Sequence, residues 1–504
     1  MNILSLILIN ALYFIGSSTA WSFGVGYYTL YRPVIAGMLT GLILGDMSLG
    51  MIAGAIVNIA YLGFVSTGGS LKGDPCLTGI IAAIGAIVFN INAIEALALA
   101  FPFGFIGIFI WKYRLKINIY FVQKFENDDR LNSKSIFLYN ALLPQLLLLA
   151  MSTIVMLVCF LILYLLQSYF IAYYEFLRNV LFLSGMFIIL NSIFSNLLMI
   201  KDKKLILLYF LTFIILTFVN SNIVIYVLAA FLIYCIIVDF KNTSKINYSN
   251  SGISRQSLFR SWSIWMNFSH ACYNFDRMQG LAFAHTMKNI ICRLYDKEEK
   301  RVERIKYYTD FFNTEPNLGT PIHGYVIALE EKRAKEESVE AIDINKLKKS
   351  MMGVVSGLGD SFTQTVLTPI FILFCIYFAL SKNLIGTVIS ALALAIVIIY
   401  ISYSGLLKGY YNGKSGLIDR INEVKNSIVK KYFNIIFAIL FVVIIYSIGA
   451  NYWSLIQLNY KKLLIILFSS IIYEFLLYKK IKEDYLIVLL YIIPLIIIFS
   501  YYCF

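Results

Sequence analysis

The stretch YRPVIAGMLTGLILGDMSLGMIAGA, at residues 31–55, decides which fold this chain can adopt. It is apolar over most of its length, yet glycine recurs at short intervals, at Gly37, Gly41, Gly45, Gly50 and Gly54. In lipid, glycine lets two backbones approach closely, and a broken helix is tolerated only where protein or a water-filled cavity satisfies its freed backbone groups. The stretch therefore predicts either a re-entrant segment that lines a substrate path or tightly packed helices that cross at glycines.

The rest of the chain has the composition of a membrane protein. Of its 504 residues, 60% are hydrophobic and 14% are charged. Apolar stretches of about 20 residues, the length needed to cross a hydrocarbon core about 30 Å thick, recur along most of it. The opening stretch, Asn2 to Ala20, ends like a signal-peptide cleavage site but has no basic residue before it, so we expect a retained membrane helix.

Charge and cysteine usage exclude two other classes of protein. The formal net charge of +14 is carried by short clusters between apolar segments, such as WKYRLK at 111–116 and KKIK at 479–482. This pattern is typical of cytoplasmic loops in membrane proteins and not of a nucleic-acid-binding surface. The seven cysteines are scattered without a C-x-x-C pair, so we expect no disulfide framework, no metal site and no cofactor.

Shifts in composition divide the chain into parts. Residues 1–240 are almost entirely apolar segments and form a first membrane module. Residues 241–256, KNTSKINYSNSGISRQ, form a polar linker. Residues 257–350 contain no 20-residue apolar run but show helical periodicity, so we expect amphipathic helices at the cytoplasmic face, followed by a second membrane module at 351–504. The predicted fold is an all-α polytopic membrane protein.

Four motifs in the second half carry a family resemblance. They are CYNFDRMQGLAF (272–283), FFNTEPNLGTPIHG (311–324), ALEEKRA (328–334) and MMGVVSGLGDSF (351–362). In this order they resemble the IID component of the mannose-family (mannose/fructose/sorbose) phosphotransferase system permeases. The stretch at 31–55, followed by LGFVSTGGSLKGD at 62–74, resembles the partner IIC component. In the family these two components are usually separate proteins, and here the linker joins them in one chain.

The resemblance implies a fold and a function. It implies two pseudo-symmetric helical modules with re-entrant segments, in a multi-pass protein of the bacterial cell (inner) membrane that associates as a homotrimer. It further implies a permease that binds and translocates a hexose or amino sugar, which a separate phospho-IIB protein phosphorylates. The expected partners are the sugar, cytoplasmic IIA/IIB phosphocarrier proteins and membrane lipid. The chain has three histidines, His270, His285 and His323, and none lies in a soluble α/β domain, so we expect packing roles for them and no catalytic residue.

Recognition of sugar hydroxyls needs polar side chains, and these are costly inside a membrane unless they are paired or functional. The candidates for substrate binding in the first half are Asn58, Ser66, Lys72 and Asp74. Those in the second half are Asn274, Asp276, Arg277, Gln279, Asn313, Glu330, Glu331 and Asp360. We expect Gly353, Gly357 and Gly359 to let the backbone turn near the site.

Each candidate also has a purely structural interpretation. The charged residues of 276–277 and 330–333 could form a salt-bridge network on amphipathic helices, and Asn313 could cap or turn the chain. The chain also departs from the family pattern, with Asn58 in place of a glutamate, Ser66 of an asparagine, Tyr273 of a tryptophan, Val354 of a proline, and Gln364 and Thr368 where an aromatic residue and an arginine are expected. These departures leave open a non-phosphorylating facilitator, a sugar sensor or a docking receptor on the same fold. Whether the chain counts as an enzyme subunit is also left open.

Overall fold

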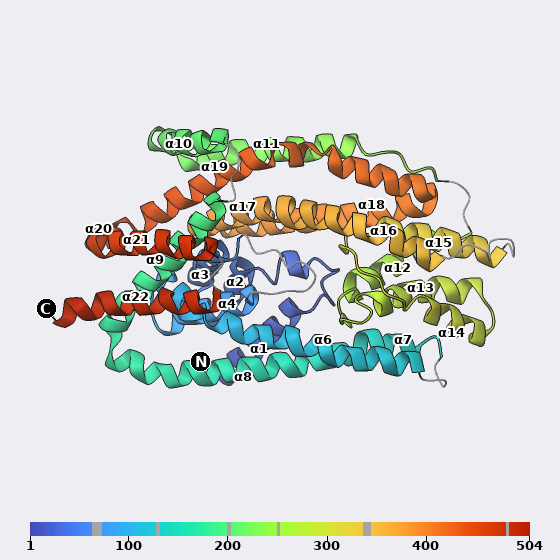
Figure 1. Cartoon of the computed structure of the whole chain (residues 1–504), viewed down its shortest axis with the longest axis horizontal. Helices are drawn as coiled ribbons and strands as arrows, with labels where there is room; N and C mark the ends of the chain where they lie inside the picture. The colour runs from blue at the N-terminus through green and yellow to red at the C-terminus, as the bar shows by residue number, and fades with distance from the viewer. Residues whose placement is uncertain are drawn as a thin grey trace.

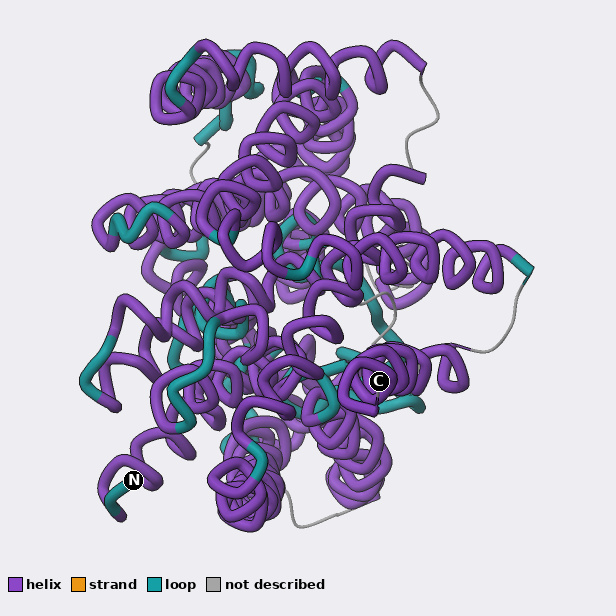
Figure 2. The backbone as a smooth tube through the Cα atoms, turned by 90° about the vertical axis from the view of Figure 1, so that its left-hand side faces the viewer, coloured by secondary structure: helices purple, strands orange, loops and turns teal. Residues whose placement is uncertain are grey.

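The computed structural model describes residues 1–62, 73–127, 132–198, 203–248, 252–335, 344–479 and 483–503. Within these ranges the chain forms helices and no β-strand, which confirms the all-α prediction (Figure 1). Five of the described helical stretches are long and apolar enough to cross a membrane, and a sixth is added if the bent pair α5–α6 counts as one span. Viewed along the long axis of the molecule, several helices are seen end-on (Figure 2).

The first half begins with short helices and continues with long ones. Its elements are α1 (Ile3–Ser17), η1 (Gly26–Tyr28), α2 (Pro33–Leu44), α3 (Met47–Ala60), α4 (Pro75–Val88), α5 (Ala93–Ala100), α6 (Phe103–Asn127), α7 (Ser135–Phe137), η3 (Leu138–Leu142), α8 (Leu143–Ala172), α9 (Tyr174–Leu198), α10 (Lys203–Phe218) and α11 (Ser221–Lys241).

The second half also combines short and long helices. Its elements are α12 (Arg255–Phe268), α13 (Gly280–Leu294), α14 (Glu298–Tyr307), α15 (Thr320–Lys335), α16 (Ile344–Gly359), η5 (Asp360–Leu367), α17 (Thr368–Leu380), α18 (Leu384–Lys425), α19 (Ile428–Asn451), α20 (Trp453–Leu458), α21 (Tyr460–Tyr478) and α22 (Glu483–Cys503). α18 consists of two segments joined at Gly413, whose φ of +60° breaks the helix.

The glycine-rich stretch folds into the hairpin of α2 and α3. Gly45 ends α2 with a φ of +93°, and the carboxylate of Asp46 caps α3 by accepting from the Leu49 N–H at 2.8 Å. A Cβ on Gly50 would lie 2.4 Å from the carbonyl oxygen of Gly37, so glycine is what lets the two helices touch. With 12 and 14 residues, each helix is about 18–21 Å long, too short to cross about 30 Å alone.

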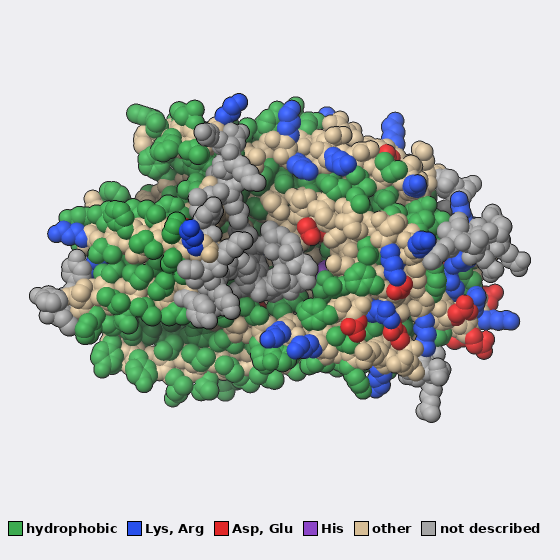
Figure 3. Space-filling model, in the orientation of Figure 1, with side chains coloured by type: hydrophobic (Ala, Val, Ile, Leu, Met, Phe, Trp, Pro, Cys, Tyr) green, Lys and Arg blue, Asp and Glu red, His purple; other side chains and the backbone are tan. Residues whose placement is uncertain are grey.

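Charged side chains gather at one end of the molecule. The helices α12–α15 lie together at the right-hand end of Figure 1. The space-filling view in the same orientation shows that acidic and many basic side chains are concentrated there, whereas the opposite end is mainly hydrophobic (Figure 3). This is the distribution expected when one end stands in water and the other in lipid.

Each half contains a long helix interrupted by a π-helical segment ahead of a proline. In the first half, η3 leads into α8 with Pro144 in its first turn, and in the second half, η5 leads into α17 with Pro369 in the same place. The sequences FLYNALLP (137–144) and FTQTVLTP (362–369) share the spacing from phenylalanine to proline. A proline has no N–H and disturbs the helical ladder before it, which accounts for the wider turns at both places.

The two halves interlock. α3 packs against α17, and α9 of the first half packs against both α21 and α22 at the far end of the chain. α10 and α11 pack along α19. The segment that joins the halves is itself docked on α18, because the Ser244 N–H donates to Glu423 at 2.8 Å and the Asn247 N–H donates to Asn412 at 3.0 Å.

Candidate functional site

A cavity of about 130 Å³ lies at the junction of the two halves. The connection between α1 and η1, together with Trp111 on α6, forms one wall. The segments 269–273 and 313–317 and the α16–η5 helix form the other. This volume is well above the roughly 10–15 Å³ that a cavity needs to hold one water molecule, so the cavity has room for several.

Two acidic residues, Asp360 and Glu315, line this cavity. Asp360 opens the π-helical segment η5, and Glu315 lies in the loop before α15. Gly359 packs directly against Glu315, since a Cβ on Gly359 would lie 2.4 Å from the Glu315 Cβ. Glycine is therefore required there for the next residue, Asp360, to come close to Glu315.

The local sequence holds Glu315 in place. Its carboxylate accepts from the backbone N–H groups of Asn317 at 3.1 Å and Leu318 at 2.6 Å, as expected for an acidic side chain that closes a turn. It also accepts from the Asn317 amide at 2.7 Å and the Tyr28 hydroxyl at 3.0 Å. Burial nevertheless outweighs these hydrogen bonds and raises the pKa of Glu315, and the nearby charge of Asp360 adds to the rise.

Asp360 is less enclosed than Glu315. Within the part of the chain that the structure describes, the one hydrogen-bond partner of its carboxylate is the amide of Gln364, which donates at 3.1 Å. The neutral Gln364 leaves the charge of Asp360 uncompensated. Asp360 therefore has acceptor capacity free for a ligand.

An aromatic wall faces the carboxylates. Tyr27 and Tyr31 stack with their ring centroids 5.6 Å apart, and the indole N–H of Trp111 donates to the Tyr31 hydroxyl at 3.4 Å. The guanidinium of Arg32 lies over the ring of Tyr27 at 5.2 Å, and that of Arg114 lies over Trp111 at 4.6 Å. Neither arginine lines the cavity, so the wall presents ring surfaces and hydroxyl groups.

Two of the predicted residues shape the remaining wall. Asn313 lines the cavity and accepts from the Tyr273 hydroxyl at 3.2 Å. Gln279 fixes the adjoining backbone by accepting from the Thr314 N–H at 2.9 Å and donating to the Thr314 carbonyl at 3.0 Å. Gln279 also lies 3.3 Å from His270, which lines the cavity. Burial, reinforced by the charge of Arg114, lowers the pKa of His270 to about 4, so this histidine is neutral at pH 7.

The two described candidates of the first half, Asn58 and Asp74, do not line the cavity. Asp74 is buried and caps α4 by accepting from the Leu77 N–H at 3.0 Å, and it accepts from the Tyr13 hydroxyl at 2.7 Å. Asn58 is buried on α3 and accepts from the Val34 N–H at 3.4 Å. Ser66 and Lys72 lie outside the described residues.

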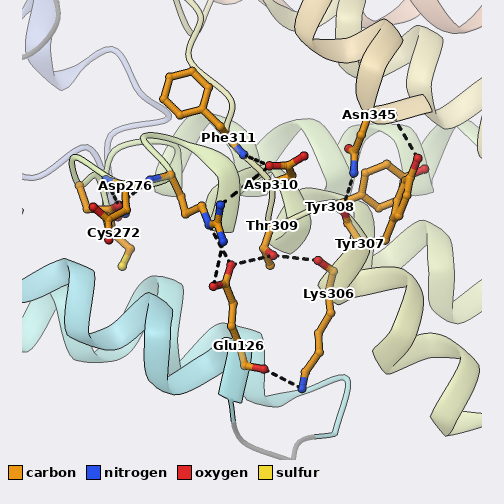
Figure 4. A network of polar contacts seen from close by, with 12 residues as sticks. Glu126, Cys272, Asp276, Lys306, Tyr307, Tyr308, Thr309, Asp310, Phe311 and Asn345 are labelled. Carbon is orange, nitrogen blue, oxygen red and sulfur yellow. Dashed lines mark hydrogen bonds and ion pairs between the residues drawn. The ribbon is translucent and has the colours of Figure 1, made fainter. Parts of the chain in front are cut away.

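The residues at 274–277 lie at the charged end of the molecule. Asn274 closes a turn by accepting from the N–H groups of Asp276 and Arg277 at 3.0 and 2.9 Å, and the side chain of Asp276 is exposed. Arg277 binds Glu126 of α6 at 3.0 and 3.2 Å. In Figure 4 the carboxylate of Glu126 meets this network from the first half, beside Thr309 and Asp310. These groups tie the two halves together.

Glu330 and Glu331 belong to separate networks on α15. Glu330 is fully buried and accepts two hydrogen bonds from Arg304, at 2.8 and 2.7 Å. Burial opposes its ionisation, but the hydrogen bonds and charge of Arg304 outweigh burial and hold the pKa of Glu330 below its ordinary value. Glu331 binds Lys335 at 2.6 Å and the Gly252 N–H at 2.8 Å.

The observed roles of the glycines and histidines differ in part from the predicted ones. The helix α16 runs through Gly353 and Gly357 without a turn, so the prediction that the backbone bends there is wrong. Only Gly359 makes the close approach described above. His285 and His323 are both buried among aromatic rings, away from the cavity. Among the described residues, no three His, Cys, Asp or Glu side chains come together as a metal site would require.

The sequence reasoning missed Glu315, Tyr28 and Trp111 as parts of the site. A signal for Glu315 was present, because a glutamate before proline within a motif of a largely apolar protein needs partners. Tyr28 and Trp111 gave no such signal. They are two of 36 tyrosines and 5 tryptophans, and only the fold shows which of them face the cavity.

Comparison with known proteins decides the family. The family model described as "PTS system sorbose-specific iic component" matches residues 3–236, and the one described as "PTS system mannose/fructose/sorbose family IID component" matches residues 252–502. The chain belongs to the mannose/fructose/sorbose family of phosphotransferase system components. It carries a IIC part and a IID part in one polypeptide, and it is a multi-pass protein of the bacterial cell (inner) membrane.

Individual relatives match parts of the chain. The IID part is similar to the sorbose-specific EIID component of Lacticaseibacillus casei, with 32% identity over 34% of this chain and 60% of that protein. The IIC part is similar to the N-acetylgalactosamine permease IIC component 1 of Escherichia coli K12, with 35% identity over 15% of this chain and 28% of that protein. The chain thus spans about three fifths of the first relative's length. A solved structure titled as the mannose transporter ManYZ in complex with microcin E492 covers 50% of this chain and 98% of its own, at 25% identity and a TM-score of 0.31.

Proposed function

We propose that this protein is a sugar permease that binds a hexose or amino sugar in the cavity between its IIC and IID parts and carries it across the membrane. A separate phospho-IIB protein, supplied by IIA, phosphorylates the sugar on the cytoplasmic side. The observation that carries the proposal is the cavity at the junction of the two parts, which is lined by carboxylates and by aromatic rings.

The cavity wall has the chemistry that a carbohydrate needs. Sugar hydroxyls both donate and accept hydrogen bonds, and the wall offers Asp360, Asn313 and neutral His270 for these roles.

The location of the cavity supports phosphorylation from the cytoplasm. Trp111, which lines the cavity, begins the basic cluster WKYRLK at 111–116. Basic clusters mark the cytoplasmic boundary of a membrane, so we place the cavity near that boundary and the charged end of the molecule in the cytoplasm. A phosphocarrier protein could then reach a bound sugar without crossing lipid. The remaining candidates, Asp74, Asn274, Arg277, Glu330 and Glu331, would support the wall and not touch the sugar.

Three architectural features belong to the same proposal. The α2–α3 hairpin and α4 act as re-entrant segments, because each helix is too short to span the membrane alone. The matching π-helical segments η3 and η5 relate the two parts as a pseudo-symmetric pair. The units associate as a homotrimer in lipid, which the mass of the purified protein in nanodiscs would test.

A facilitator without phosphorylation is the second candidate. The observation that favours it is Gln364, which lines the cavity and stands where the family resemblance leads one to expect an aromatic residue. If coupling has been lost, sugar would equilibrate across the membrane and appear inside unmodified.

Reconstituted vesicles separate the two candidates. We expect vesicles that contain the protein, the general phosphocarrier proteins and a matching IIA/IIB pair to accumulate labelled sugar phosphate. Omission of IIB should abolish accumulation of the phosphate. Asp360→Ala should abolish uptake, whereas Asp296→Ala, at an exposed acid outside the cavity, should not. Free sugar inside vesicles that contain IIB would support the facilitator, and no uptake of any hexose or amino sugar would contradict both candidates.

A further inference from the structure

A second cavity, which shares no lining residue with the first, lies where α11 meets η5, α18 and the start of α19. Its volume is about 50 Å³. Its walls are largely apolar, with Ile236 and Phe240 from α11, Phe362 from η5 and Val397 from α18. The cavity therefore suits the hydrocarbon part of a ligand.

The position of this cavity relative to the membrane follows from α11. This helix, Ser221–Lys241, is long and apolar enough to cross a membrane. The lining residues Asp239, Phe240 and Thr243 lie at its end. Basic residues at the end of a span mark the cytoplasmic side, and Lys241 is such a residue. We therefore place the cavity at the level of the lipid headgroups of the cytoplasmic leaflet.

The two acids that line this cavity are already bound within the protein. Asp239 accepts from the Ile428 N–H at 2.7 Å, which joins the end of α11 to the start of α19. Glu423 forms ion pairs with Arg420, at 3.1 Å, and with Lys408. Two acids and two bases balance, so this inner group carries no net charge.

Four further lysines close to the cavity are not compensated in this way. Lys241 ends α11, Lys425 ends α18, and Lys430 and Lys431 lie in the first turn of α19. These four lysines, the lysine cluster, lie near one another because the ends of the three helices meet. Among the residues that the structure describes, none of the four forms an ion pair. Uncompensated lysines at the cytoplasmic boundary attract anionic lipid headgroups.

We propose that the second cavity and the lysine cluster bind one anionic phospholipid of the cytoplasmic leaflet. The phosphate of the lipid lies among the lysines, and the first carbons of an acyl chain enter the apolar cavity. A soluble phosphate would leave the apolar walls uncovered, and a zwitterionic lipid would leave the lysines uncompensated. An anionic phospholipid matches both parts of the site.

The bound lipid lies against a segment that also reaches the first cavity. Phe362 and Leu367 line the second cavity and belong to η5, whose first residue, Asp360, lines the first. The lipid therefore supports the π-helical segment from the side opposite the sugar. The binding of the lipid itself does not depend on the proposed transport of sugar.

Native mass spectrometry of the full-length protein tests the inference. The purified protein is incubated with equal amounts of dioleoyl phosphatidylglycerol, which is anionic, and dioleoyl phosphatidylcholine, which has the same chains but no net charge. We expect phosphatidylglycerol to occupy the one-lipid complex at least about fivefold more often, because each lysine near an anionic headgroup strengthens binding about fivefold. An excess of glycerol 3-phosphate should not displace it, since the acyl chain contributes to binding.

Variants show whether the lysines and the cavity cause this preference. Lys430→Gln combined with Lys431→Gln should lower the ratio of bound phosphatidylglycerol to phosphatidylcholine several-fold. The matched control, Lys112→Gln with Lys116→Gln, removes two exposed lysines of α6 that line neither cavity and should leave the ratio unchanged. Ile236→Trp fills the apolar space from α11 and should reduce the bound fraction of both lipids.

Several results would overturn the inference. Equal occupancy by the two lipids in the unaltered protein is one, and an equal fall of the ratio in both lysine pairs, which would indicate general attraction to a positive surface, is another. Displacement by glycerol 3-phosphate would assign the lysines to a soluble anion. Unchanged lipid binding in Ile236→Trp together with loss of the oligomer would assign the cavity to a second copy of the chain. Each result leaves the permease proposal in place, because the measurement is lipid occupancy and not uptake.

Discussion

The hydroxyl of Tyr28 donates a hydrogen bond of 3.0 Å to the carboxylate of Glu315, across 287 positions of sequence. Tyr28 belongs to the IIC part and Glu315 to the IID part, so one hydrogen bond joins the two parts at the wall of the cavity. Asn317 donates to the same hydroxyl at 2.9 Å. The geometry of the cavity and the association of the parts are therefore linked.

This relationship predicts that Tyr28→Phe lowers stability. The variant leaves the ring in place but removes a donor to a buried carboxylate, and a hydrogen bond to a charged group contributes about 1.5–3 kcal/mol. Thermal unfolding in nanodiscs, followed by tryptophan fluorescence, should show a lower Tm. Tyr113→Phe, at a half-exposed position of α6, is the matched control. Equal Tm values for the two variants would show that the bond contributes nothing.

The sequence predicted the class of the fold because that class depends on composition. The apolar stretches, the polar segment at 241–256 and the motifs of the second half can each be read locally. The packing of α21 and α22 against α9 could not be predicted, since apolar helices of similar composition give no sign of which neighbours they choose. Membrane helices associate through shape, and shape appears only in the fold.

The residues of the candidate site could be predicted only in part, because the sequence does not show which side chains meet in the fold. Asp360 and Asn313 lie in the cavity, as the motifs suggested, whereas Glu330 is an equally prominent acid of a motif and binds Arg304 instead. Sequence shows that a buried acid needs a partner but not whether that partner is a side chain or a ligand.

The Arg304–Glu330 pair predicts a sensitivity to acid. Both side chains are almost fully buried, so Glu330→Gln should lower the free energy of unfolding by about 3–5 kcal/mol. Because the folded pKa of Glu330 is below its unfolded value, the stabilisation is present at neutral pH and is lost as pH falls through the folded pKa. Denaturation curves at several pH values should show a weaker pH dependence in the variant. Glu303→Gln, which breaks an exposed pair with Lys300, should change little.

The α2–α3 hairpin predicts an intolerance of side chains at its glycines. A Cβ on Gly54 would lie 2.2 Å from the Pro33 carbonyl oxygen, so Gly54→Ala must force the helices apart. Overpacking of this kind costs about 1–3 kcal/mol, and the yield of monodisperse protein on size-exclusion chromatography should fall. Gly449→Ala, in α19 with no atom within 4 Å of the added Cβ, should behave like the unaltered protein. Normal yield and Tm for Gly54→Ala would contradict the close packing.

The interlocked helices predict that the covalent link is dispensable for association. α9 binds α21 and α22, and Asp239 at the end of α11 accepts from the Ile428 N–H at 2.7 Å, so many contacts hold the halves together without the linker. Residues 1–248 and 249–504, co-expressed as two chains with a tag on one, should co-purify. A tagged 249–504 chain expressed alone should give less folded protein, because α21 and α22 lose their neighbour. Recovery of the tagged chain without its partner would show that fusion is essential.

Variants of Asp74 distinguish a role in the fold from a role in the cavity. It caps α4 and accepts from Tyr13 at 2.7 Å, but it does not line the cavity as Asp360 does. Asp74→Ala should therefore abolish uptake by disrupting the turn, since it loses a cap worth about 0.5–2 kcal/mol and leaves a buried tyrosine unpaired. Asp74→Asn retains one oxygen, which can accept from the Leu77 N–H, and its amide nitrogen can donate to the Tyr13 hydroxyl. This variant should therefore keep a large share of uptake, whereas Asp360→Asn should not. Sugar uptake by cells that express equal amounts of membrane-inserted variants tests this contrast, and a complete loss in Asp74→Asn would instead assign its charge a direct part in transport.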